Sequence, residues 1–367
     1  MKRGLVVLDP AEIPEREWRD RVAAVARRMT AEGIDVALIY GDVSRSDDIG
    51  WLTNLCVYWN EGVLAIPANG DPVLLTKLSP RVHPWMRRIS TVTEVRSGKS
   101  FGALVAGYLA ERDGPGTAGL VDARLWPAAT VEDIGAGLAA VPGWRLTHLG
   151  GLVRELRLIP SGTELALLQR GAATLAAAAE RACRPGLTAT GRVAAVESDL
   201  RGAGYLDVAC RATETVDGVT VLQITGQYRN SWLHVSRLVG GDGSPGWPAA
   251  VRDALAAAVR AAGDGITAAN LAAAAGPALA AAAGPAPAAL PPGTRSAVRW
   301  VNQADMATGG EYAGYPDSLP MAAGSVVVIS VEAEFADGRT AAAADTVLIQ
   351  NGGTGDGAVS LTGKASR

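Results

Sequence analysis

The sequence predicts two domains, an α/β domain over residues 1–155 and an α+β domain over residues 156–367. The chain of 367 residues is longer than one hydrophobic core usually organises. In the first part, short apolar runs typical of strands alternate with helical patterns, as expected for an α/β domain. In the second part, a long amphipathic helix precedes several strand-like runs, so we expect helices packed on a curved antiparallel sheet.

The first domain is predicted from its apolar spacing and its turn residues. A helix over 15–32 has one apolar stripe, and Gly33 supplies the residue that ends it. The stripe consists of Val22, Val25, Ala26 and Met29. The sequence Asn-Gly-Asp-Pro indicates a hairpin within 62–76. The other expected elements are strands over 34–41, 90–97, 116–122 and 144–150, and helices over 101–111 and 131–140.

The second domain begins with a long helix whose N-cap is Ser161 or Thr163. Glu164 lies in its first turn, where a carboxylate favours the helix dipole, and a Pro-Gly pair ends it. Further helices are expected over 192–202 and, as a pair, within 248–283. Strands are expected over 206–214, 219–228, 231–241, 295–302, 325–335 and 343–352.

Composition excludes several classes of partner. The chain has 34 Lys and Arg against 37 Asp and Glu, and no basic block, so we expect neither nucleic acid nor membrane as a partner. The N-terminal stretch lacks the apolar core of a signal peptide, which predicts a cytoplasmic protein. Three widely spaced cysteines fit reduced thiols better than a disulfide framework. A small molecule or another protein chain is the expected partner.

Several stretches, in order along nearly the whole chain, resemble one known family. They are the opening helix and strand with the later sequence DDIGWLTNL, the segment LVRELRLIPSGTELALLQRGA, the hairpin VLQITGQYRNSWLHVSRL and the two final strands. Together they are similar to the creatinase/prolidase/aminopeptidase P group. The resemblance implies a second domain of the "pita-bread" fold, a homodimer, and in the metalloenzymes of the group a dinuclear centre held by two Asp, one His and two Glu.

Most of those metal ligands are absent from this sequence. The first Asp position falls on Gln223 and the second on His234, and no histidine stands where the metal-binding His would lie. The first Glu position falls on Glu332, with Glu334 as an alternative, and the second falls on Ala344, beside Asp345. The histidines of the chain are His83, His148 and His234. Because bridging carboxylates suit a pair of divalent ions and an amide does not, we expect neither a dinuclear centre nor another cofactor.

Two interpretations of this loss compete. Creatinase, which the resemblance brings in, works without metal, so His234 is our candidate acid/base and Glu332 its carboxylate partner. The alternatives are a structural histidine and a site that only binds. The leading function is therefore a metal-independent enzyme acting on a small amino-acid-derived or guanidino compound, by C–N cleavage, rearrangement or cyclisation. A non-catalytic binding protein is second and an Xaa-Pro metallopeptidase third.

Further candidates for substrate binding surround this pair. Strand alternation places Trp232 on the face of His234 and Arg237 on the other face, although Trp232 also fits a core and Arg237 a structural ion pair. Glu332 lies in a strongly apolar run and should need a partner such as His234, Arg237 or a cationic substrate. The remaining candidates are Gln223, Tyr228, Asp305 and Glu311, with Tyr58 and Trp59 of the first domain, a region that in related dimers reaches the partner's cavity.

Overall fold

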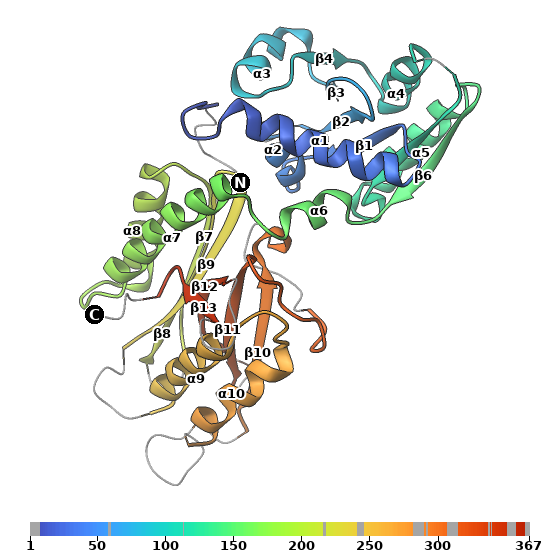
Figure 1. Cartoon of the computed structure of the whole chain (residues 1–367). Coiled ribbons are helices and arrows are strands. Elements are labelled where there is room, and N and C mark those ends of the chain that lie inside the picture. The colour runs from blue at the N-terminus through green and yellow to red at the C-terminus, as the bar shows by residue number, and fades with distance from the viewer. Residues whose placement is uncertain are drawn as a thin grey trace. The chain divides into compact units, whose positions relative to one another are not determined.

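The structure is a computed structural model, and it divides the chain into two compact units, one ending at Arg157 and one beginning at Leu158. It describes residues 8–57, 60–112, 114–215, 218–240, 246–281, 290, 293–306, 315–336, 338, 340–350 and 357–363. Each unit is α and β in composition, as predicted (Figure 1). Among the described residues, no helix combines the length and the apolar character needed to cross a bilayer.

The first unit is built on a six-stranded mixed sheet of order β4-β3-β2-β1-β5-β6. The predicted hairpin is β2–β3, which is antiparallel, whereas β1–β5, β5–β6 and β3–β4 are parallel. The strands are β1 (Val36–Gly41), β2 (Gly62–Pro67), β3 (Val73–Thr76), β4 (Glu94–Ser97), β5 (Gly116–Val121) and β6 (Trp144–Leu149). The helices are α1 (Glu15–Ala31), α2 (Asp47–Thr53), α3 (His83–Ile89), α4 (Phe101–Ala110), α5 (Ala128–Leu138) and α6 (Leu152–Arg157), with 3₁₀ turns η1 (Pro80–Val82) and η2 (Ala123–Leu125).

Helices cover both faces of this sheet, because successive strand side chains point to opposite sides. On one face, Ile39 of β1 packs in a buried cluster with residues of α1, α2, α3 and α6. On the other, Leu38 packs in a second cluster with residues of α4 and α5. The buried stripe of α1 is Trp18, Arg21, Val25 and Met29, so the predicted stripe is rotated.

The second unit is built on a sheet of order β10-β11-β12-β9-β8-β7, with β13 paired to β12, and all its named strand pairs are antiparallel. The strands are β7 (Tyr205–Glu214), β8 (Thr220–Tyr228), β9 (Ser231–Val239), β10 (Arg295–Asn302), β11 (Val326–Glu334), β12 (Thr340–Ile349) and β13 (Ala358–Ser360). The helices are α7 (Gly162–Ala182), α8 (Ala189–Gly202), α9 (Trp247–Ala261) and α10 (Ala268–Ala281), with the 3₁₀ turn η4 (Gln303–Asp305). Ser161 is the N-cap of α7 and forms a capping box with Glu164, which decides between the two predicted caps.

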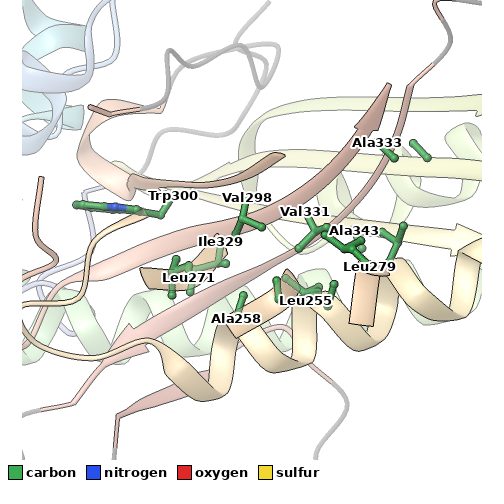
Figure 2. Close-up of a cluster of buried hydrophobic side chains, with 14 of the residues drawn as sticks. Leu255, Ala258, Leu271, Leu279, Val298, Trp300, Ile329, Val331, Ala333 and Ala343 are labelled. Carbon is green, nitrogen blue, oxygen red and sulfur yellow. The ribbon is translucent and has the colours of Figure 1, made fainter. Parts of the chain in front are cut away.

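The main core of this unit lies between helices α9 and α10 and the β10–β12 part of the sheet. Figure 2 shows Leu255 of α9 and Leu271 of α10 among Ile329 and Val331 of β11 and Ala343 of β12. Elsewhere α7 contacts β8 and β9 while α8 contacts β7. The helices thus support a sheet whose strands β8, β9, β11 and β12 carry the candidate site residues.

Candidate functional site

The candidate site lies where β9 runs beside β12, and side chains complete the pairing of these two strands. Ala344 and Ser236 are the one pair of residues in register between β9 and β12. Beside them, the Thr346 hydroxyl accepts from the backbone N–H of His234 at 3.0 Å and donates to its carbonyl oxygen at 2.8 Å. The Ser236 hydroxyl donates to the carbonyl of Ala342 at 2.7 Å. We call this hydrogen-bonded boundary between β9 and β12 the seam.

His234 is buried at the seam, with 5% of its surface exposed. Its Nδ1 lies 2.8 Å from the hydroxyl oxygen of Thr225, the residue opposite it on β8. Burial, reinforced by the positive charge of Arg237, lowers the pKa of His234 from 6.5 to about 4. The imidazole is therefore neutral near pH 7, and its ring orientation is fixed by Thr225. Such a ring can exchange hydrogen bonds or a proton with a ligand, but it is no fixed cation.

The side chains packed beside His234 on the same face of the sheet are apolar. Register places Trp232, His234 and Ser236 on one face, as alternation predicts. Trp232 is fully buried and packs in a cluster with Ala344 and Val328. Met306 and Val301 complete that cluster. Trp232 is thus part of a small core, the structural alternative given for it above.

Glu332 lies elsewhere, and its environment corrects the sequence-based expectation. Its side chain is 36% exposed rather than buried, and its partner is Arg299 of β10, with Oε2 and Nε 3.7 Å apart. The Ser330 hydroxyl donates to its Oε1 at 3.3 Å. Neither His234 nor Arg237 pairs with it, and its partner Arg299 lies two residues from Ala297, the residue in register with Glu332 on the edge strand β10. The alternative carboxylate, Glu334, is exposed at the end of β11, in register with Arg295.

The distance between His234 and Glu332 follows from the strand register. His234 is bonded to Thr346, whose partner on β11 is Val328, whereas Glu332 is four residues further along that strand. At about 3.3 Å per residue and about 4.8 Å per strand, the two backbones are separated by roughly 16 Å. The structure therefore does not bring the two proposed catalytic residues together.

Arg237 links β9 to β12 on the opposite face of the sheet. Its guanidinium pairs with Asp345 at 2.8 Å and donates to the carbonyls of Thr362 at 2.6 Å and Ala344 at 2.9 Å. The Thr362 hydroxyl also donates to Asp345 at 3.1 Å. These contacts are those of a structural ion pair, one of the two roles the sequence left open for Arg237.

The other candidates are distributed around the sheet. Gln223 is half-buried on β8, opposite Ser236. Tyr228 is buried against α7, with its ring 5.2 Å from that of Tyr205, on the face opposite His234. Asp305, in η4, accepts a hydrogen bond from the Tyr315 hydroxyl. Glu311, Tyr58 and Trp59 lie outside the described residues.

Two residues of the site, Thr225 and Thr346, were missed by sequence reasoning. Thr225 stands two residues after Gln223, hence on the same face of β8, and Thr346 directly follows Asp345. Its spacing of two residues from Gln223 was the sequence signal that could have identified Thr225. For Thr346 the signal was weaker, because its partner is 112 residues away in the sequence.

The residues present do not fit the dinuclear metal centre that the resemblance implies. Ala344, at one ligand position, has no exposed surface and packs among apolar side chains. Gln223 offers only a neutral amide and Glu332 is turned toward Arg299. Within the part of the chain that the structure describes, no group of three or more His, Cys, Asp or Glu is placed to hold a metal ion.

Comparisons with known proteins extend the resemblance. The family model of the Creatinase/Prolidase N-terminal domain matches residues 21–159. Among curated proteins, none matches the sequence. Solved structures match over nearly their whole length. The dipeptidase PepE from Mycobacterium ulcerans has 21% identity, covers 98% of this chain and 98% of its own, and has a TM-score of 0.67.

Two further solved structures show the same fold at lower identity. The X-Pro aminopeptidase from Thermotoga maritima MSB8 has 14% identity, covers 94% of this chain and 98% of its own, and has a TM-score of 0.72. The prolidase from Pyrococcus horikoshii OT3 has 16% identity, covers 94% and 99%, and has a TM-score of 0.66. At these identities the likeness establishes the fold, and the family model establishes the kind of first domain.

Proposed function

We propose that this chain, which carries a Creatinase/Prolidase N-terminal domain and the two-domain fold of prolidases and aminopeptidase P, binds a small ligand in its second domain without metal. The ligand class is a small amino-acid-derived or guanidino compound. The cleavage of Xaa-Pro bonds, which the names of the similar structures suggest, is not its reaction.

One observation carries this proposal. At the seam, the position of a metal-binding Glu is Ala344, which is fully buried in a cluster with Trp232 and Val328. A carboxylate-bridged pair of ions needs several oxygen ligands converging on one polar space. Here the converging groups are a neutral imidazole and the hydroxyl of Thr225. These groups suit hydrogen bonding to a neutral or polar ligand atom rather than the activation of a hydroxide.

Acid/base catalysis by His234 is the second candidate function. It is favoured by the pKa of about 4, because an imidazole that is neutral at pH 7 can accept a proton during a reaction. Thr225 would orient the ring through Nδ1, and Nε2 would transfer the proton. We rank this candidate below binding because Glu332, the intended carboxylate partner, stands roughly 16 Å away by strand spacing.

The test compares His234→Gln with His148→Gln in the full chain. His148 is exposed on β6 of the first unit, so its substitution controls for loss of an imidazole. Creatine, other guanidino compounds, free amino acids and Xaa-Pro dipeptides are screened by the shift of the melting temperature, and mass spectrometry follows each compound for turnover. A binding role predicts that affinity for the compound found falls about tenfold or more in His234→Gln alone, without turnover by the parent.

Other outcomes separate the remaining functions. Turnover that is reduced about 10²- to 10⁴-fold in His234→Gln makes the chain a metal-independent enzyme. Two equivalents of Mn²⁺, Co²⁺, Fe²⁺ or Zn²⁺ by elemental analysis, together with chelator-sensitive Xaa-Pro hydrolysis, would overturn the proposal and restore the metallopeptidase. Binding that is equal in the parent and in both variants would place the ligand site away from the seam.

A further inference from the structure

The first unit contains a polar groove that plays no part in the proposed function. Its volume is about 570 Å³, within the range of about 300–1,000 Å³ typical of small-molecule sites. It runs along one end of the sheet, where β1, β5 and β6 begin, and is closed by β4 and the end of α4. Every residue that lines it belongs to the first unit.

One of the two arginines of the groove is fully neutralised by the protein. Arg96 of β4 forms ion pairs with Glu94 at 2.6 Å and with Glu111 at 2.8 Å. The hydrogen bond with Glu111, followed by that with Glu94, raises the pKa of Arg96 above its usual range. Arg96 therefore serves as a fixed wall of the groove, and its charge is not available to a ligand.

The second arginine, Arg112, is not neutralised. Its guanidinium stacks on the ring of Tyr108, 4.5 Å from the centroid, and donates to the Tyr108 hydroxyl. Among the described residues no carboxylate pairs with it, and its buried Nε has no acceptor. Since no described carboxylate offsets its charge, an anionic group of a ligand in the groove that Arg112 lines would be stabilised there.

Tyr108 adds a second donor at the same place. Because its hydroxyl oxygen accepts from Arg112, its own proton remains to be donated, and no described residue receives it. Burial raises the pKa of Tyr108, so the hydroxyl keeps that proton near pH 7. Two adjacent donors, one of them cationic, form a site for a carboxylate oxygen.

The rest of the groove selects among anions. Asp71, Glu94 and Glu111 line it, and because Glu94 and Glu111 share the one positive charge of Arg96, this wall keeps a net negative charge. Their charge disfavours a multiply charged anion such as phosphate and favours a ligand that also carries a cation. Trp144 supplies an apolar surface. We propose that this groove binds a small zwitterion, a free amino acid, with its carboxylate on Arg112 and Tyr108 and its ammonium on the acidic wall.

The experiment uses the full chain and isothermal titration calorimetry. Mixtures of the proteinogenic L-amino acids, and then single members, are titrated at millimolar concentration, with inorganic phosphate as the competing anion. The amino acid that binds is compared with its N-acetyl and its C-amide forms, each of which lacks one of the two charges. We expect both blocked forms to bind at least about tenfold more weakly, and phosphate to bind more weakly than the amino acid.

Variants then locate the site. Arg112→Gln should weaken binding about 10- to 100-fold, since it removes a charged hydrogen bond, and Tyr108→Phe should weaken it about tenfold while keeping the stacked ring. The matched control is Arg124→Gln, because Arg124 is exposed beyond the opposite end of β5. Melting curves check that each variant is folded.

Several results would overturn this proposal. They are the absence of binding by any amino acid at millimolar concentration, blocked forms that bind as well as the free one, phosphate that binds more tightly, and Arg112→Gln with unchanged affinity. Binding that is lost in His234→Gln and kept in Arg112→Gln would place the amino acid in the second unit. That last result would support the proposed function and refute amino-acid binding in the groove.

Discussion

The burial of His234 makes a quantitative prediction about acid stability. Its pKa is about 4 in the folded protein, against about 6.5 when exposed. As the pH falls below about 6.5, His234 becomes protonated in the unfolded chain, whereas in the folded chain it stays neutral until about pH 4. The folded state therefore loses stability relative to the unfolded state over this pH window. At about 1.4 kcal/mol for each tenfold difference in proton affinity, the loss between pH 7 and pH 4 is about 3 kcal/mol.

His234→Gln isolates this contribution, because glutamine can still hydrogen-bond with Thr225 and does not titrate. Urea unfolding of the parent and the variant is followed by circular dichroism at several pH values between about 7 and 4. We expect the variant to be less stable than the parent at pH 7, and this gap to close by about 3 kcal/mol as the pH falls to 4. If parent and variant lose the same stability over this range, His234 is not held neutral and buried, and its assigned role at the seam fails.

Three further predictions concern packing and assembly. Gly102→Ala places a Cβ 2.1 Å from the carbonyl oxygen of Asp133, so in urea unfolding it should destabilise the first unit by about 3 kcal/mol. In the control, Gly107→Ala of the same helix, the added Cβ meets no atom within 4 Å, so this variant should be as stable as the parent or more stable. Ala344→Glu buries a carboxylate in the apolar cluster around Trp232 and should lower the melting temperature far more than the control Thr340→Glu, which lies at an exposed position of β12. Equal melting temperatures of the two variants would mean that this cluster is open to solvent. The homodimer implied by the family resemblance should appear in light scattering at micromolar concentration, and a monomer alone would contradict it.

Helix ends were predicted best where the local sequence carries a capping residue. The capping box of Ser161 and Glu164 fixes the start of α7, and Gly33, at a φ of +68°, follows the end of α1. The short helices α2, α3 and α6 were not predicted, because six or seven residues are too few to show an apolar period.

Long-range contacts explain where the sequence misled. In α1, Arg21 is buried because its guanidinium lies 4.7 Å from the ring of Trp18 and 5.0 Å from that of Trp51, and it donates to the Trp51 carbonyl. Periodicity alone assigns an arginine to solvent. Likewise the apolar run around Glu332 suggested a buried carboxylate, although the partially exposed strand β10 provides Arg299 beside it. Neither Trp51 nor Arg299 is recognisable as a partner from local sequence.

The seam holds β9 and β12 together through side-chain hydrogen bonds and one ion pair. Here the Thr346 hydroxyl binds both backbone groups of His234, and Arg237 and Asp345 form an ion pair across the same two strands. Ala344, between them, is small enough to let Trp232 fill the space on its own face. These contacts form a hydrogen-bonded junction with an apolar cluster on one face, so a carboxylate placed at position 344 should destabilise the sheet.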